Sequence, residues 1–352
     1  MSSKIRALVV DDSAFVRKVV SQMLARSPEI EVVGTARDGV DALEMVARFK
    51  PDVVTLDLVM PRMNGVEFLR EQANRTPVPV VICSIAHETG EMALDAFEAG
   101  AVDFVRKPTA LATDRVYEIA DELIAKVIAA SQASLRPALP ATPIATAALS
   151  PSHRSGSVAG LEATAEIVVI GVSTGGPQAL RHLIPSLPAD FPVPIAIVLH
   201  MPVGYTKMYA ERLNDISALE VIEVEEGAPL RPGVAWLAPA GQHLTFLRDS
   251  AGVVRAHLDL RPLDTQHRPA VDVLFRSAAD VFGAAVLGVV MTGMGADGTA
   301  GAGEIRARGG HVITEAASSC VVYGMPRAVV EAGLSDRSAP LSTLAEAIME
   351  ML

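Results

Sequence analysis

The chain has 352 residues, half of them hydrophobic, and a formal net charge of −11. This length and hydrophobic content suit two globular domains with separate cores, while the acidic balance argues against nucleic-acid binding, which needs clustered Lys and Arg. No apolar run reaches the roughly 18 residues of a membrane span, and the start of the chain has no secretory signal. We expect a cytoplasmic protein without membrane insertion, in which Cys83 and Cys320 are buried free thiols.

Short apolar runs alternate with amphipathic helical stretches over roughly the first third of the chain. The runs are IRALVV, EVVGTA, VVTLD, VPVVICS and AVDFV. Continuous apolar runs predict strands that are buried on both faces of a parallel sheet, and the helices between them provide right-handed crossovers. The first domain is therefore predicted to be a doubly wound α/β fold.

Polar side chains follow directly after these predicted strands. Asp11 and Asp12 follow ALVV, Asp57 follows VVTL, Ser84 follows VVIC, and Lys107 follows DFVR. Because the carboxyl ends of parallel strands meet at one edge of a sheet, we expect these side chains to converge. Three converging carboxylates need a cation, and an all-oxygen site suits Mg²⁺. A lysine and a serine hydroxyl can bind an added phosphoryl group, although any single aspartate here could be only a helix cap.

The segments DDSAFVRK, LDLVMPRMNG and AGAVDFVRKP resemble a two-component receiver domain, and the resemblance covers residues 4–125. It implies a flavodoxin-like fold in which Asp57 accepts the phosphoryl group and Ser84 and Lys107 sense it. The implied Mg²⁺ ligands are Asp11, Asp12, Asp57 and the backbone carbonyl of Val59. Asn64 stands where many receivers have Asp, and both residues tolerate a turn. We place this domain at residues 1–126.

A linker is predicted at residues 127–162. Ala, Ser and Pro dominate residues 131–160, and this stretch contains no Asp or Glu. Such a segment cannot bury enough apolar surface to offset its ordering entropy. The alternative, an irregular part of one large domain, is less favoured because long structureless loops are uncommon in compact domains.

A second α/β domain with a mainly parallel, Rossmann-like sheet is predicted at residues 163–352. Its apolar runs are IVVIGV, PIAIVLH, AWLAP, AVLGVVMT and HVIT, and residues 219–263 have more β than α character. We take this region as an additional β element of the second domain.

The first of these runs leads into Gly171-Val172-Ser173-Thr174-Gly175-Gly176-Pro177. The segment lacks the G-x-x-x-x-G-K-[ST] and G-x-G-x-x-G patterns, so a phosphate-binding loop is disfavoured. The remaining interpretations are a plain tight turn and a strand-to-helix elbow that presents a nucleophilic Ser173. A helix that begins near Pro177 would direct its N–H groups and its positive dipole end towards Ser173, which suits an oxyanion.

A nucleophilic serine needs a base and an orienting carboxylate. His200 follows PIAIVL, and Asp297 lies in GMGADG after AVLGVVM. We therefore predict a Ser173–His200–Asp297 triad, since triads are defined by geometry rather than by chain order. His200 could instead be structural, and Asp297 could be a turn residue or a helix cap. Other candidates for the base are His243, His257, His267 and His311. A zinc hydrolase is not expected, because H-E-x-x-H and C-x-x-C are absent.

Six motifs resemble the catalytic domain of the chemotaxis response-regulator protein-glutamate methylesterases. They are IGVSTGGPQAL, LHMPVGYT, RPGVAWLAPAGQH, HRPAVDVLF, MTGMGADG and CVVYGMPR, and they span about residues 165–350. The resemblance implies that Ser173 is the nucleophile, His200 the general base and then acid, and Asp297 the orienting group. It also implies that the backbone N–H of Met294 belongs to the oxyanion hole, with Thr174 beside the nucleophile.

The resemblance further implies hydrolysis of glutamate γ-methyl esters on methyl-accepting chemotaxis receptors, with release of methanol and without a cofactor for the esterase step. Some members also deamidate receptor glutamines. The implied phosphodonor is the chemotaxis histidine kinase, and we expect the unphosphorylated receiver to cover Ser173 and inhibit. The family often has Gln before the triad histidine, where this chain has Leu199. HRPAVDVLF is expected to begin a helix with Pro269 near its first position, and His267 and Arg268 are not expected to be catalytic.

Three other functions remain as alternatives. The first is a phosphorylation-gated adaptor that binds receptors without hydrolysing them, and the second is an esterase that acts on receptors for another surface behaviour. A transcription factor is less favoured, because the second half has neither a basic patch nor a helix-turn-helix pattern.

Overall fold

The computed structural model describes residues 4–75, 77–84, 90–107, 115–133 and 165–352. The first domain is a five-stranded parallel sheet in the order β2-β1-β3-β4-β5. The strands are β1 (Ile5–Val10), β2 (Ile30–Ala36), β3 (Val53–Leu56), β4 (Val80–Ser84) and β5 (Asp103–Arg106). The helices are α1 (Ala14–Leu24), α2 (Gly39–Phe49), α3 (Gly65–Ala73), α4 (Gly90–Glu98) and α5 (Arg115–Ser131). The predicted flavodoxin-like α/β fold is confirmed.

Polar residues start the first three helices. The side chains of Ser13 and Asp38 accept hydrogen bonds from the first turns of α1 and α2. Asn64 and Glu67 form a capping box at the start of α3, in which each side chain accepts from the other residue's N–H at 2.9 Å. Asn at position 64 therefore suits this turn, as expected.

The second domain contains a seven-stranded parallel sheet in the order β14-β13-β12-β6-β7-β9-β8 and a separate antiparallel pair, β10-β11. The strands are β6 (Ile167–Val172), β7 (Ile195–Leu199), β8 (Glu220–Glu223), β9 (Val234–Leu237), β10 (His243–Arg248), β11 (Val254–Asp259), β12 (Val286–Val290), β13 (His311–Glu315) and β14 (Arg337–Ala339). The helices are α6 (Gly176–Leu183), 3-10 helix η1 (Ile184–Ser186), α7 (Thr206–Asp215), α8 (Val271–Phe282), α9 (Thr299–Ala307), α10 (Met325–Glu331) and α11 (Leu341–Met349). Four strands lie within the region where extra β structure was predicted.

The order of this sheet reverses at β6. From β6 the sheet extends through β7 to β9 and β8 on one side, and through β12 to β13 and β14 on the other. Such a switch point leaves a crevice at the carboxyl ends of the strands. Since β7 and β12 both pair with β6, the loops that follow these three strands meet there.

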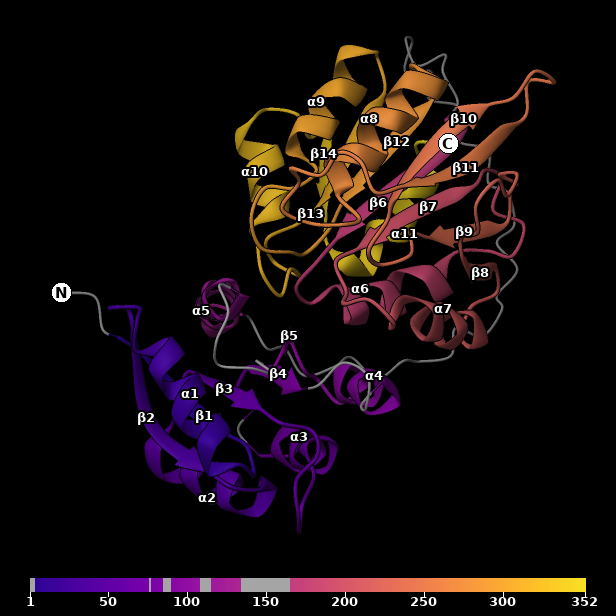
Figure 1. The fold of residues 1–352 in the computed structure, drawn as a ribbon. Helices are drawn as coiled ribbons and strands as arrows, with labels where there is room; N and C mark the ends of the chain where they lie inside the picture. The colour runs from indigo at the N-terminus through magenta and orange to yellow at the C-terminus, as the bar shows by residue number, and fades with distance from the viewer. Residues whose placement is uncertain (1–3, 76, 85–89, 108–114, 134–164) are drawn as a thin grey trace.

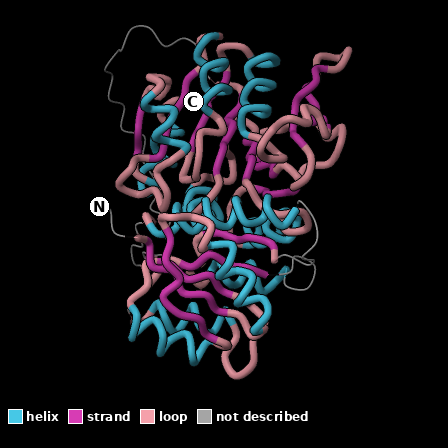
Figure 2. Tube along the Cα trace, turned by 60° about the vertical axis from the view of Figure 1, so that its left-hand side comes forward, coloured by secondary structure: helices cyan, strands magenta, loops and turns pink. Residues whose placement is uncertain are grey.

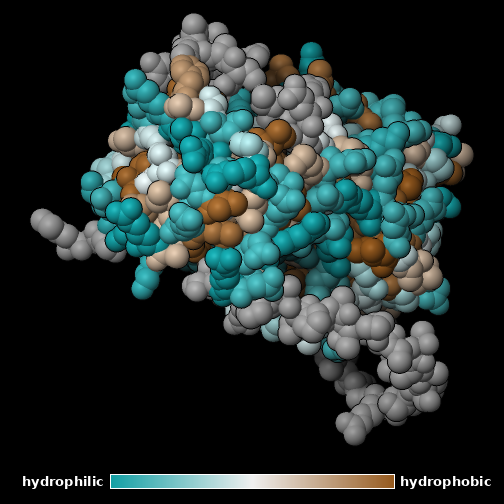
Figure 3. Space-filling model, turned by 90° about the horizontal axis from the view of Figure 1, so that it is seen from below, coloured by the Kyte–Doolittle hydropathy of each residue, from teal (hydrophilic) through white to brown (hydrophobic). Residues whose placement is uncertain are grey.

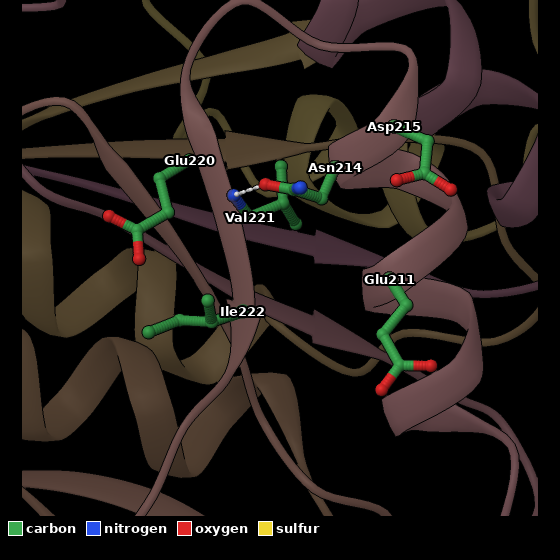
Figure 4. Close-up of a pocket in the computed structure, with 6 residues that line it drawn as sticks. All are labelled: Glu211, Asn214, Asp215, Glu220, Val221 and Ile222. Carbon is green, nitrogen blue, oxygen red and sulfur yellow. Dashed lines mark hydrogen bonds between the residues drawn. The ribbon is translucent and has the colours of Figure 1, made fainter.

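The outer edge of the sheet is covered by a side chain. The Asn214 side-chain oxygen, at the end of α7, accepts a hydrogen bond from the backbone N–H of Val221 in β8 at 3.0 Å (Figure 4). This bond satisfies one N–H that an edge strand would otherwise expose. A pocket beside it is lined by Glu211, Asn214, Asp215, Glu220, Val221 and Ile222.

The two domains share one hydrophobic cluster, which we call the interdomain core. It includes Leu94, Phe97 and Phe104 of the first domain and Leu180 and Tyr205 of the second. The Phe104 and Tyr205 ring centroids lie 5.4 Å apart. Figures 1 and 2 show α4, β5 and α5 turned towards the second domain, with α4 next to α6 and α7. Figure 3 shows the molecule from below, on the side where the first domain lies in Figure 1. On this face the surface is mostly hydrophilic, with scattered apolar patches.

Two details differ from the sequence predictions. Helix α5 continues to Ser131, so the first residues expected to be linker are helical, and the rest of that segment from residue 134 on lies outside the described residues. Helix α8 starts at Val271 after Ala270, so Pro269 precedes the helix rather than occupying its first position. Cys83 and Cys320 are buried and free, as predicted. Among the described helices, none is long and apolar enough to cross a membrane.

Candidate active site

The three predicted triad residues follow three adjacent strands. Ser173 comes directly after β6, His200 directly after β7, and Asp297 lies in the loop between β12 and α9. Backbone hydrogen bonds extend the sheet into these loops, with Ser173 N to Thr292 O at 3.0 Å and His200 N to Val172 O at 3.1 Å. The residues therefore share one edge of the sheet, as their positions after apolar runs predicted.

His200 and Asp297 form the buried polar pair of this site. His200 Nε2 lies 2.9 Å from Asp297 Oδ2, and the side chains are 8% and 13% exposed. Burial acts to raise the pKa of the Asp297 carboxyl, but the hydrogen bond and charge of His200, helped by the N–H groups of Asp272 and Val271, hold it below its usual value. Asp297 is thus an anion that fixes the orientation of His200.

The second ring nitrogen of His200 is available for proton transfer. Nδ1 is buried and has no hydrogen-bond partner in the described part of the chain. In this conformation no hydrogen bond between described residues joins the Ser173 hydroxyl to His200. Since Nε2–H donates to Asp297, Nδ1 is the nitrogen that can accept the serine proton once the two approach, which is common for catalytic pairs without substrate.

Glycines allow the loops to approach Ser173 closely. Gly175 has φ +78°, and a Cβ there would lie 2.5 Å from Cβ of Val321. A Cβ on Gly293 would lie 2.8 Å from Cβ of Ser173. Larger residues at either position would displace the nucleophile loop.

Two backbone N–H groups in the loops that meet at Ser173 are candidates for an oxyanion site. The N–H groups of Thr174 and Met294 donate to no acceptor among residues 165–352 or the described parts of the first domain. Thr174 follows Ser173 directly, and the residue after the nucleophile supplies an oxyanion donor in serine hydrolases with a strand-to-helix elbow. Helix α6 begins at Gly176, so its positive end also lies beside Ser173.

Three of the alternative histidines have structural surroundings. His243 is fully buried, lies 3.2 Å from the Pro262 carbonyl through Nε2, and accepts from Ala270 N through Nδ1 at 3.2 Å. His257 pairs with Glu226, and His311 lies against Asp336. These contacts make the three residues supports of the β10–α8 and β13 regions.

His267 is the exception, because it lies on the predicted base. Its ring stacks on His200 with centroids 4.0 Å apart and 22° between the planes. Burial, with a smaller effect from the charge of His200, lowers the pKa of His267 to about 4. The sequence expectation gave His267 no catalytic role, and nothing here assigns it one. The structure nevertheless makes this neutral ring a wall of the site, and the motif HRPAVDVLF was the available signal.

Glu315 is a buried contact of the site that the sequence reasoning did not identify. Its carboxylate accepts from Thr292 N at 2.9 Å and from the Ser319 hydroxyl at 2.9 Å. Thr292 in turn donates its hydroxyl to the Thr174 carbonyl at 2.9 Å. Burial raises the pKa of Glu315. The only signal was its position at the end of the predicted strand HVIT.

Leu199, the residue before the predicted base, belongs to the hydrophobic core. It is fully buried, and a Cβ on Gly176 would lie 2.7 Å from its Cδ1. The position therefore packs β7 against the start of α6.

The polar residues of the first domain also converge. Lys107 Nζ lies 2.7 Å from Asp11 Oδ2 and 2.7 Å from Asp57 Oδ2, and Ser84 Oγ lies 3.5 Å from Asp57 Oδ1. One carboxylate oxygen from each of Asp11, Asp12 and Asp57 falls within 4.8 Å of the others. These five residues form the crevice that the sequence predicted.

This crevice has the donor set for a hard cation. Burial, helped by the negative charge of Asp11, raises the pKa of Asp57 in spite of Lys107. Asp12 is exposed, which leaves the cluster open to solvent. The negative charge of the three carboxylates exceeds the single positive charge of Lys107, and such an oxygen-donor set fits Mg²⁺. Ligation by the Val59 carbonyl stays a prediction.

The first domain directly contacts the loop that follows Ser173. The Thr174 hydroxyl donates to the Asp103 carboxylate, and Gly175 N donates to the Val102 carbonyl at 3.0 Å. Asp103 is also paired with Lys126 of α5 at 3.0 Å. The start of β5 is therefore bound to the residues immediately after Ser173.

Comparisons with known proteins point the same way as the geometry. The family model for the CheB methylesterase matches residues 168–348, and the model for the response regulator receiver domain matches residues 7–116. A protein-glutamate methylesterase/protein-glutamine glutaminase of Myxococcus xanthus is 54% identical over 340 residues, which cover 96% of this chain and 95% of that protein. One of Symbiobacterium thermophilum is 46% identical over 353 residues, 98% of this chain and 96% of that protein.

A solved structure gives the same result for the second domain. The CheB methylesterase catalytic domain of Thermotoga maritima covers 54% of this chain and 100% of its own length, with 42% identity and a TM-score of 0.52.

The pocket at the β8 edge contains none of the predicted triad residues.

Proposed function

The chain belongs to the CheB methylesterase family and also carries a receiver domain, and from this premise we propose how its residues perform and regulate the reaction. It is a response regulator that hydrolyses glutamate γ-methyl esters of proteins, as the names of relatives that match nearly its whole length indicate. The observation that carries the mechanism is the His200–Asp297 hydrogen bond at a strand end next to that of Ser173.

In the first half of the proposed reaction, Ser173 Oγ attacks the ester carbonyl carbon while His200 Nδ1 takes the hydroxyl proton. The oxyanion receives hydrogen bonds from the N–H groups of Met294 and Thr174, each worth roughly 10²–10³ in rate. Asp297 stabilises the imidazolium that forms on His200. Collapse of the tetrahedral intermediate breaks the bond to the methoxy group, which leaves as methanol with the proton from His200.

In the second half, water attacks the glutamyl ester of Ser173. His200 Nδ1 takes a proton from this water and returns it to Ser173 Oγ as the acyl bond breaks. The glutamic acid that is released loses its remaining proton to solvent and leaves as the carboxylate. A glutamine side chain would follow the same course with ammonia as the leaving group, and deamidation is therefore within reach of the same residues.

We propose that phosphorylation of Asp57 controls access to Ser173. Asp11, Asp12 and Asp57, with the Val59 carbonyl, would hold Mg²⁺, which neutralises phosphoryl charge when it is bound. The added phosphoryl group brings nearly two negative charges, and Lys107 and Ser84 are the groups that would move to meet it. Lys107 follows the carboxyl end of β5, whereas the contacts to Thr174 and Gly175 come from the start of this strand. A movement of Lys107 would therefore have to pass along β5 to disturb them.

The proposed substrates are methyl-accepting chemotaxis receptors, and the proposed phosphodonor is the histidine kinase of the same signalling array. We infer both the substrates and the phosphodonor from the family resemblance, and not from a contact in this molecule. We propose the cytoplasm as the site of action, because a kinase that draws on ATP must reach Asp57 there. Receptors for another surface behaviour are the alternative substrate class.

The test is methanol release from methylated receptor membranes, measured with and without acetyl phosphate and Mg²⁺. We expect the phosphodonor to stimulate wild type, Ser173→Ala to abolish release, and Ser186→Ala, an exposed serine just after α6, to leave it unchanged. Asp57→Asn, or chelation of Mg²⁺ by EDTA, should remove the stimulation but keep the basal rate.

Each result has a separate meaning. Release that survives Ser173→Ala would remove this serine from the mechanism. No release from wild type with any receptor preparation would favour the alternative of a receptor-binding adaptor without hydrolysis.

A further inference from the structure

Two helices begin at the active site without a cap of their own. Helix α8 follows Ala270 and helix α9 follows Gly298, and neither residue makes a side-chain capping hydrogen bond. The first N–H groups of a helix nevertheless need acceptors when they are buried. In this molecule each helix obtains them from the other.

Asp297, just before α9, provides the acceptors for α8. Its Oδ2 accepts from Val271 N at 2.8 Å, and its Oδ1 accepts from Asp272 N at 2.9 Å. Oδ2 also accepts from His200. Both oxygens of the triad carboxylate are therefore fixed by the start of α8.

Asp272, in the first turn of α8, provides the acceptor for α9. Its Oδ1 accepts from Gly298 N at 2.9 Å and from Gly301 N at 2.7 Å. Gly298 is the residue next to Asp297, so Asp272 holds the backbone from which the triad carboxylate projects. We call this arrangement the reciprocal cap.

Glycines make the reciprocal cap possible. Gly298 has φ +95°, and a Cβ there would lie 2.8 Å from Cγ1 of Val271. A Cβ on Gly301 would lie 2.5 Å from Cβ of Phe275 and 3.1 Å from Cα of Asp272. The two helix starts are thus in direct contact, within reach of each other's carboxylate.

We propose that Asp272 is a positioning residue of this methylesterase, which fixes Asp297, and through it His200, by holding the start of α9. The proposal rests on the proposed function, because it assigns Asp272 to the same reaction. Asp272 does not touch the serine or the histidine, and its effect passes through the Gly298 backbone.

Asp272 also contributes charge. Asp297 and Arg276 are the charged groups that act on its carboxyl, while Asp297 and the stacked His267 face His200. Lys126 and Asp103 of the first domain act on His267. A second carboxylate behind Asp297 favours the imidazolium that forms on His200 during attack.

The experiment separates the effect of the Asp272 hydrogen bonds from the effect of its charge. It uses the full chain, activated with acetyl phosphate and Mg²⁺. Asp272→Ala removes both hydrogen bonds to α9, whereas Asp272→Asn keeps an Oδ1 acceptor and removes only the charge. Asp280→Ala is the matched control, because Asp280 lies on the same helix and also links it to α9, through Arg308.

We expect Asp272→Ala to lower kcat/KM for methanol release about 10²-fold, as misplacement of a catalytic group does. Asp272→Asn should stay within about threefold of wild type at the alkaline plateau, while the acidic limb of its pH profile moves to lower pH. Asp280→Ala should stay within about twofold. Melting temperatures identify variants that are folded.

The positioning role is overturned if folded Asp272→Ala keeps kcat/KM within threefold of wild type, or loses no more than Asp280→Ala. An acidic limb that does not move in Asp272→Asn overturns the electrostatic part. Where Asp272→Ala does not fold, Asp272→Leu, which keeps the bulk of the side chain but offers no acceptor to Gly298 N and Gly301 N, is measured against the same limits. Failure of wild type to release methanol instead rejects the proposed function, which keeps the two outcomes distinct.

Discussion

At the scale of single residues, the site is defined by which nitrogen of His200 faces which partner. Nε2 is committed to Asp297, and Nδ1 is left for the serine proton. Burial, with a smaller effect from the charge of His200, lowers the pKa of the stacked His267 to about 4, which keeps this ring neutral at neutral pH. The neutral His267 ring thus lies against the histidine that we propose as the base.

The low basicity of His267 predicts a pH dependence of stability. The pKa of His267 is about 4 in the folded chain against an ordinary value of 6.5, so between these values the unfolded chain binds a proton that the folded chain does not. Folding stability should therefore fall as the pH falls through this window. His267→Phe keeps an aromatic ring but cannot be protonated. Between about pH 7 and about pH 5 this variant should therefore lose about 1–2 kcal/mol less unfolding free energy than wild type.

Urea unfolding at the two pH values measures this difference. His182→Ala is the control, because His182 is exposed and should leave the pH dependence unaltered. Equal losses of stability in wild type and His267→Phe would show that His267 is not held neutral by its surroundings.

At the scale of elements, helix α4 is the main polar contact of the first domain with the second. Arg181 of α6 pairs with Glu98 at 2.8 Å, and Arg212 of α7 pairs with Asp95 at 2.6 Å and with Glu98 at 3.2 Å. Gln178 of α6 donates to the Phe97 and Ala101 carbonyls at 3.1 and 3.3 Å. These contacts hold β5 over Thr174 and Gly175.

Loss of the α4 ion pairs should raise the basal esterase rate. The arginines are about 30% exposed, so each pair contributes roughly 0.2–1 kcal/mol. Arg181→Ala combined with Arg212→Ala should increase methanol release without phosphodonor about two- to fivefold, and leave the fully phosphorylated rate unchanged. Arg306→Ala, which breaks a pair with Asp336 inside the second domain, is the control. A basal rate equal to wild type would mean that these pairs do not restrain the domains.

The elements themselves could be predicted from the sequence to a large extent. Strands buried on both faces must be continuously apolar, and the ends of such runs located the acidic cluster and the positions of Ser173, His200 and Asp297. The short edge strand β14 was missed, because Arg337 and Ser338 are exposed and carry no apolar run. The reciprocal cap was also missed, since Asp272 and Gly298 are joined only by the packing of α8 on α9.

At the scale of the whole molecule, the sequence indicated that a receiver could cover the nucleophile but not which surface would do so. The contacts come from α4 and β5, with Val102 and Asp103 at the start of β5. Asp103 and Thr174 are 71 positions apart, and no local pattern predicts that they meet. The chemical roles of the triad and of the Mg²⁺ ligands stay predictions until the variants are measured.

The interdomain core has a consequence for how the protein melts. Because Phe104 and Tyr205 belong to one apolar cluster, neither domain can unfold without exposing the other's surface to water. The unphosphorylated protein should give a single cooperative endotherm in scanning calorimetry, and acetyl phosphate with Mg²⁺ should split it into two. Two endotherms before phosphorylation would mean that the domains unfold independently. The thermogram thus reports separation of the domains in an assay that needs neither receptor nor ester.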